Sequence, residues 1–141
     1  MVNDYHEAIY FIRGTDANGA LLDGRSTYKM TFAKNALPPM DRSRGGFWSV
    51  TMYDKDYFML PKSPNGRTNI GTVSLDANEL KFASDGSLTI TMSHAQPDDA
   101  VARANWLPAP EGQFALIVRA YVPTQPVLDG SYKLPNVQRE K

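Results

Sequence analysis

Residues 47–53 read Phe-Trp-Ser-Val-Thr-Met-Tyr, and their alternation decides the fold. Successive side chains of a β-strand point to opposite faces of a sheet. Trp48 and Met52 therefore share one face, while Phe47 and Tyr53 share the other. Because both faces carry aromatic residues, the pattern predicts a central strand that is covered on both sides.

The same period of two recurs on both sides of this stretch and predicts four further strands. They are expected at residues 8–12, 28–32, 87–93 and 113–122. The last of these is apolar almost throughout and rich in strand formers, which is typical of a central strand. The chain also carries 10 Gly and 10 Pro, which leave no long uninterrupted helical pattern.

Two local patterns refine this prediction. Asp85-Gly86 stands between residues 80–82 and 88–90, and such a dipeptide between apolar runs predicts a β-hairpin. Residues 97–104 are the best candidate for a short helix, because acidic residues in a first turn favour the helix dipole; an ordered loop is the alternative. Roughly eight short strands with frequent turns predict an all-β fold, an antiparallel sandwich or barrel.

Composition limits both the organisation and the function of the chain. Its 141 residues fit one domain spanning 1–141, and 15 basic residues balance 15 acidic ones. We therefore expect neither nucleic acid nor a membrane as a partner. With no cysteine, disulfides, thiolate metal sites and thiol nucleophiles are excluded. The N-terminus has no basic region followed by an apolar one, so we expect a soluble, cytoplasmic protein.

Several separated motifs resemble one bacterial family, domain of unknown function 1214. They are Gly46–Asp54, Asp85–Ile90, Asn105–Pro110, Arg119–Tyr121 and Leu128–Gly130. The likeness runs over about residues 10–137. It implies a β-sandwich of the jelly-roll type, and it implies no activity, because the family has none assigned.

The resemblance also implies a missing neighbour. Family members usually carry this domain behind a companion, domain of unknown function 1254, and many members are exported. The 141 residues contain neither the companion nor an export signal. Apolar surface that the companion would cover is then expected to be exposed, and exposed apolar patches tend to be interfaces. We therefore expect a homo-oligomer.

The polar residues and the aromatic ones that accompany them along the predicted strands and loops are the candidates for ligand binding. They are Trp48, Tyr53, Arg67, His94, Trp106, Arg119 and Tyr121. The leading hypothesis is a binding or accessory module for a small molecule or a glycan. Arg119 interrupts an apolar strand, and a buried guanidinium must be paired. It is interpreted either as a structural pin on Asp54 or Asp129 or as the group that reads an anionic ligand.

Two other classes of function remain open in the sequence. One is an enzyme, a hydrolase or isomerase with a site around His94 and Arg119, although no Gly-x-Ser-x-Gly nucleophile motif occurs. The other is a structural interaction domain that pairs through its sheet edges. His94 with Asp98 and Asp99 is too sparse for a metal site, so neither a metal nor another cofactor is expected, and no catalytic residue is assigned.

Overall fold

The computed structural model describes residues 8–60 and 63–140, and within them eight strands form two four-stranded sheets. The first sheet has the order β1-β7-β3-β4 and the second β6-β5-β2-β8. The strands are β1 (Ala8–Arg13), β2 (Tyr28–Phe32), β3 (Phe47–Asp54), β4 (Asn69–Gly71), β5 (Leu88–Ser93), β6 (Trp106–Pro108), β7 (Phe114–Tyr121) and β8 (Gln138–Arg139). The expected all-β character is confirmed.

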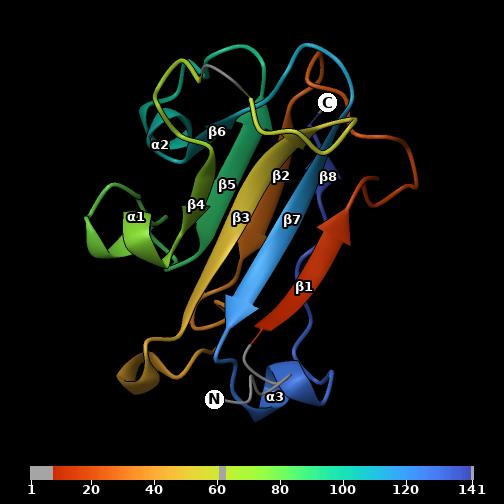
Figure 1. The fold of residues 1–141 in the computed structure, drawn as a ribbon. Helices are drawn as coiled ribbons and strands as arrows, with labels where there is room; N and C mark the ends of the chain where they lie inside the picture. Colours follow the sequence, from red (N-terminus) through yellow and green to blue (C-terminus); the bar gives the residue numbers. More distant parts are fainter. Residues whose placement is uncertain (1–7, 61–62, 141) are drawn as a thin grey trace.

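Within the same described residues, four short helical turns connect these strands (Figure 1). They are η2 (Arg42–Arg44), α1 (Thr72–Asp76), α2 (Ala100–Ala104) and α3 (Gln125–Leu128). The predicted helix at 97–104 is confirmed as α2, which begins later than expected because the Asp99 carboxylate accepts a hydrogen bond from the backbone N–H of Ala102 and caps it. Along the two described segments, no helix has the length and hydropathy needed to cross a bilayer.

The two sheets share one hydrophobic core. Alternate side chains of β3 (Trp48, Val50, Met52) and β7 (Leu116, Val118) are almost fully buried against those of the second sheet. The second sheet supplies Met30 and Phe32 from β2 and Leu88, Ile90 and Met92 from β5. Phe32 and Trp48 bring the two sheets into direct contact, with ring centroids 5.4 Å apart. The alternation of apolar and polar residues in the sequence therefore matches the alternation of buried and outward-facing side chains in these strands.

The central position predicted for two strands is confirmed. β7 pairs with β1 on one side and β3 on the other, and β3 lies between β7 and β4. The predicted cover on both faces of β3 is wrong for the part of the chain that the structure describes. Phe47 on its outer face is 36% exposed, and Tyr10 on the outer face of β1 is 58% exposed. One side of this sheet faces the core and the other faces solvent.

One strand pair departs from the expected antiparallel arrangement. β5 and β6 run parallel, because the chain leaves β5 at Ser93, crosses through α2 and returns at Trp106. A parallel pair requires such a crossover of about a dozen residues, whereas a hairpin needs only a tight turn. The second sheet is therefore mixed, and the first is antiparallel throughout its described pairs.

The predicted hairpin at 80–90 is also wrong, although its turn is present. Gly86 adopts φ of +87° and its N–H donates to the carbonyl of Ala83. Residues 80–82 form no strand, and β6 pairs only with residues 91–93 of β5. The Asn105 side chain instead holds this segment, accepting from the N–H of Lys81 at 2.8 Å and donating to its carbonyl at 2.7 Å.

Candidate functional site

The outer face of the first sheet brings together aromatic residues from three strands. The register pairs Tyr10 of β1 with Arg119 of β7, and Arg119 in turn with Ser49 of β3. One step along the sheet, Tyr121 lies opposite Phe47. All of these positions point away from the core, because their sequence neighbours on β7 and β3 point into it.

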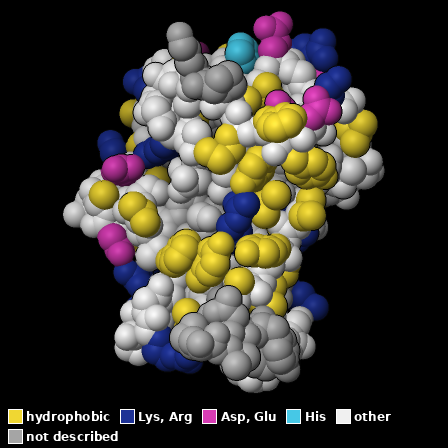
Figure 2. All heavy atoms as spheres, in the orientation of Figure 1, with side chains coloured by type: hydrophobic (Ala, Val, Ile, Leu, Met, Phe, Trp, Pro, Cys, Tyr) yellow, Lys and Arg dark blue, Asp and Glu magenta, His cyan; other side chains and the backbone are white. Residues whose placement is uncertain are grey.

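We call this surface the aromatic face, defined by Tyr10, Ile12, Phe47, Tyr53, Arg119 and Tyr121. Tyr10 and Ile12 are each 58% exposed. Figure 2 shows hydrophobic side chains gathered over β3, β7 and β1, with a basic side chain among them. Other exposed apolar residues, such as Phe58 and Val73, lie in loops or short helices. The aromatic face differs from them because it lies on a continuous sheet surface.

The rings of the aromatic face pack against one another. Phe47 and Tyr121 stack with centroids 4.4 Å apart at 22°, and Tyr10 meets Tyr121 edge-on at 6.4 Å. The neighbouring Tyr10 hydroxyl raises the pKa of Tyr121 through hydrogen bonding, and partial burial raises it further. The cluster therefore forms a pre-ordered surface in which little side-chain freedom is left to lose on binding.

Arg119 lies at the centre of this face and has only neutral partners among the described residues. Its Nη2 donates to the Tyr53 hydroxyl at 2.7 Å, and its Nη1 donates to Thr51 Oγ1 at 3.2 Å. Its guanidinium also lies 5.6 Å and 5.8 Å from the ring centroids of Tyr53 and Tyr10. The predicted pin on Asp54 or Asp129 is wrong, because Arg119 points to the outer surface.

Three other predicted site residues have structural positions. Trp48 and Trp106 are each 3% exposed; Trp48 packs in the core, and the indole N–H of Trp106 donates to the Ser93 carbonyl at 2.9 Å. Arg67 donates to the carbonyls of Ala104 and Trp106 at 2.7 and 3.1 Å and fixes the entry into β6. These side chains hold the fold together, and of the predicted set only Tyr53, Arg119 and Tyr121 meet at one surface.

His94 lies apart from Arg119. It follows β5 in the second sheet, where Nδ1 lies 3.0 Å from the Ala109 carbonyl oxygen and Nε2 lies 3.9 Å from Glu111. Arg119 points outward from the first sheet. The predicted enzymatic site around these two residues is therefore not assembled. Within residues 8–60 and 63–140, no three His, Asp or Glu side chains converge in a way that could hold a metal ion.

Sequence reasoning missed Tyr10, Ile12 and Phe47 as site residues. Each was correctly placed in a strand, and the alternation already separates the two faces of each strand. What the sequence does not contain is the register that puts Tyr10 beside Arg119 and Phe47 beside Tyr121. Register follows from the pairing of strands that lie far apart in the chain, so no local signal reveals it.

The fold and this surface define the class as a two-sheet, all-β protein with an exposed aromatic sheet face. A family model described as "Protein of unknown function (DUF1214)" matches residues 7–125. The chain belongs to this family. A search of the curated proteins found no match.

Two solved structures are similar to the chain over nearly its whole length. The VPA0106 protein from Vibrio parahaemolyticus is 31% identical over 96% of this chain, with a TM-score of 0.75. An uncharacterised protein from Burkholderia cenocepacia is 18% identical over 97% of it, with a TM-score of 0.54, and supports the fold alone. The chain spans only 31% and 30% of these two solved chains.

Proposed function

We propose that this protein is a non-enzymatic interaction module whose aromatic face docks onto a partner polypeptide. The observation that carries this proposal is Arg119, a cation held among aromatic rings with only hydroxyl partners in the described residues. Tyrosine, phenylalanine and arginine are the residues enriched where protein surfaces bind one another. The strand β3 also has the sequence pattern of a strand covered on both faces, yet no described segment lies over its outer face.

The chemistry of Arg119 specifies what the partner brings. A guanidinium has five N–H donors, and only two contacts are made to side chains of the described residues. Covering this charge with an apolar surface would leave it buried and unpaired, which is strongly unfavourable. A carboxylate placed against the remaining donors removes that cost and forms a bidentate pair. The partner surface is therefore apolar with an Asp or Glu at its centre.

A second copy of this chain fits this requirement poorly. The outward positions of β1, β3 and β7 include no acidic residue. A two-fold pairing of the aromatic face with itself would bring two Arg119 side chains together without a compensating carboxylate. Like charges in contact are unfavourable, especially when they are desolvated. The homo-oligomer expected from the sequence thus stays a prediction, and a different polypeptide is the preferred occupant.

The solved relatives support a different polypeptide as the occupant. In both, the region similar to this chain is about a third of a longer chain, so additional polypeptide is available there. Superposition on the Vibrio parahaemolyticus structure checks the proposal directly: the remainder of that chain should cover the counterpart of the aromatic face.

We further propose that the two sheets form the jelly-roll type of β-sandwich that the family resemblance implies.

The glycan module, the leading hypothesis from the sequence, fits this face less well. A sugar ring binds by stacking on an exposed aromatic face. Phe47 and Tyr121 stack on each other, and Tyr10 and Tyr53 each have Arg119 near the ring. The rings therefore face one another and the guanidinium, which suits an interface better than a sugar platform.

The test is site-specific photo-crosslinking in cells of the source organism. A photoreactive phenylalanine analogue replaces Ile12 on the aromatic face, and the control carries it at Val73, an equally apolar and 76% exposed residue of α1. We expect one discrete polypeptide adduct from position 12, none from position 73, and loss of the adduct in Arg119→Glu. An adduct of two copies would establish self-association instead. Equal adducts at both positions, or none at position 12, would contradict the proposal.

A further inference from the structure

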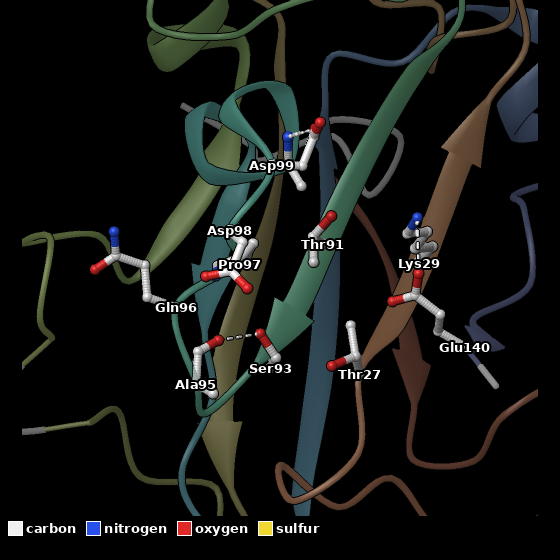
Figure 3. A pocket seen from close by; sticks show the side chains of 11 residues that line it. Thr27, Lys29, Thr91, Ser93, Ala95, Gln96, Pro97, Asp98, Asp99 and Glu140 are labelled. Atoms are coloured by element: carbon white, nitrogen blue, oxygen red, sulfur yellow. Dashed lines mark hydrogen bonds and ion pairs between the residues drawn. The ribbon is translucent and has the colours of Figure 1, made fainter.

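The second sheet has a cavity of about 390 Å³ on its outer side. Its floor includes Thr91 and Ser93 of β5, one wall is the segment 95–102 that leads into α2, and the other wall includes Lys29 of β2 and Glu140. Figure 3 shows Thr91 between Asp98 on one side and Lys29 and Glu140 on the other. This volume lies in the range of small-molecule sites.

The side-chain hydroxyls along β5 differ in their hydrogen-bond partners. Thr89 and Thr31 share a hydrogen bond of 2.8 Å across the strand pair, and Ser93 Oγ donates to the Ala95 carbonyl at 2.7 Å. Thr91 lies between them on the same face, 2% exposed, opposite Lys29, and its Oγ1 has no hydrogen-bond partner among the described residues. A buried hydroxyl without a partner is unfavourable and requires an explanation.

The charge of the lining selects the ligand. Asp98, Asp99 and Glu140 contribute three carboxylates, against the single ammonium of Lys29. Lys29 is already 3.2 Å from Glu140, and Asp99 caps α2, whereas the Asp98 side chain has no hydrogen bond or ion pair with another described residue. The Arg103 guanidinium lies behind this wall and donates to the Asp98 carbonyl at 2.6 Å, but the three carboxylates still outnumber the two cations, so the site favours a cation over an anion. No aromatic residue lines it, so a flat heterocycle would find no ring to stack on.

We infer that this cavity binds a small hydroxylated amine, such as an amino alcohol or an amino sugar. Its ammonium group donates to the Asp98 carboxylate and to Thr91 Oγ1. Its hydroxyls bond the polar groups of the rim, Thr27 and the Lys29–Glu140 pair, which offer both donors and acceptors. This site lies on the opposite sheet from the aromatic face, and the inference does not depend on the proposed docking function.

Binding is tested with three probes that share one sugar ring and differ in charge: glucosamine, glucose and glucuronate, with ethanolamine as the smallest amine. Thermal shift and NMR titration of the full chain give the affinities. We expect glucosamine or ethanolamine to raise the melting temperature and to shift the amide signals of residues 91–99, and glucuronate to do neither. If glucose binds as well as glucosamine, the assignment of an amine ligand is wrong. If neither glucosamine nor ethanolamine changes the melting temperature or the amide signals, the site itself is refuted.

Two substitutions assign the contacts. Asp98→Asn removes the charge and should weaken amine binding about tenfold or more, while Asp56→Asn, the same change at an exposed turn outside the lining, should not. Thr91→Val should raise the melting temperature of the unliganded protein by about 2–5 °C and abolish amine binding. Thr31→Val, on the same sheet face and outside the cavity, should lower the melting temperature and keep binding. Amine binding that survives Thr91→Val unchanged would remove that hydroxyl from the site.

Discussion

The two sheets present outer faces of opposite chemistry. The first exposes Tyr10, Ile12 and Phe47 on flat strand surface, whereas the outward positions of the second, such as Thr89 and Thr91, carry hydroxyls. The second face is partly covered by the 95–102 segment, which leaves a polar cavity beneath it. The first face has no such cover from the described chain. The outward residues of the two sheets thus differ with what lies over them: small polar groups lie under a covering loop, and large aromatic ones lie where the described chain provides no such loop.

The two faces also differ in the partners of their basic side chains. Lys29 on the second sheet has an ion pair with Glu140 at 3.2 Å, so this cation is paired within the chain. Arg119 on the first sheet bonds only hydroxyls of described residues. This difference is the reason for proposing a partner polypeptide on the first face and a small ligand in the cavity of the second.

The largest expected effect is a difference in stability between substitutions on the inner and the outer side of the first sheet. Leu116→Ala should lower the free energy of unfolding by about 2–5 kcal/mol, because the side chain is fully buried and its loss leaves a cavity. Ile117→Ala, one residue later and pointing outward, should cost less than about 1.5 kcal/mol. Urea unfolding of both variants measures the difference. Equal losses would mean that the outer side is already covered in the isolated chain.

A smaller effect is expected from the wall of the polar cavity. Asp99→Ala removes the carboxylate that accepts from the N–H of Ala102 and caps α2. The cost should be about 1 kcal/mol, typical of a lost N-cap. Hydrogen exchange should quicken at α2 and leave β7 unaffected, since the aromatic face rests on paired strands. Faster exchange in β7 as well would show that the two faces are not independent.

Arg119→Met should change the stability of the isolated chain by less than about 1 kcal/mol. The substitution keeps much of the packing of the side-chain stem, strands no buried carboxylate, and returns the Thr51 and Tyr53 hydroxyls to solvent. Differential scanning calorimetry makes the measurement. A large drop in melting temperature would restore the structural role that the sequence suggested for Arg119 and count against its use in docking.

The smallest effect concerns alkaline pH at the aromatic face. Because the pKa of Tyr121 is raised in the folded protein, the unfolded chain ionises first as pH rises above about 10. The stability that the protonated phenol contributes is complete below that pH and is lost as pH rises through the folded pKa. Tyr121→Phe should therefore show a shallower loss of stability between about pH 9 and 11. Thermal unfolding across that range, with Tyr57→Phe as an exposed control, makes the comparison.

The sequence by itself determined the five longest strands, β1, β2, β3, β5 and β7, and the class of fold, but it did not indicate the short strands β4, β6 and β8. The alternation at residues 47–53 and 28–32 reports burial directly, because a strand places neighbouring side chains on opposite faces. It also predicted that β3 is central and that Arg119 is informative. The aromatic residues on both faces of β3 led to a prediction of cover on both sides that was wrong, because the described chain covers only the inner face.

Only the tertiary structure decided which residues meet. The pairing of β1 with β7 placed Tyr10 next to Arg119, and the crossover through α2 placed Asp98 near Thr91 and set β6 parallel to β5. It likewise put His94 away from Arg119 and buried Trp48 and Trp106 in the fold. The reason is physical: burial periodicity is a local property of the chain, whereas strand register and loop placement result from contacts between distant segments, which compete for the same sheet edges.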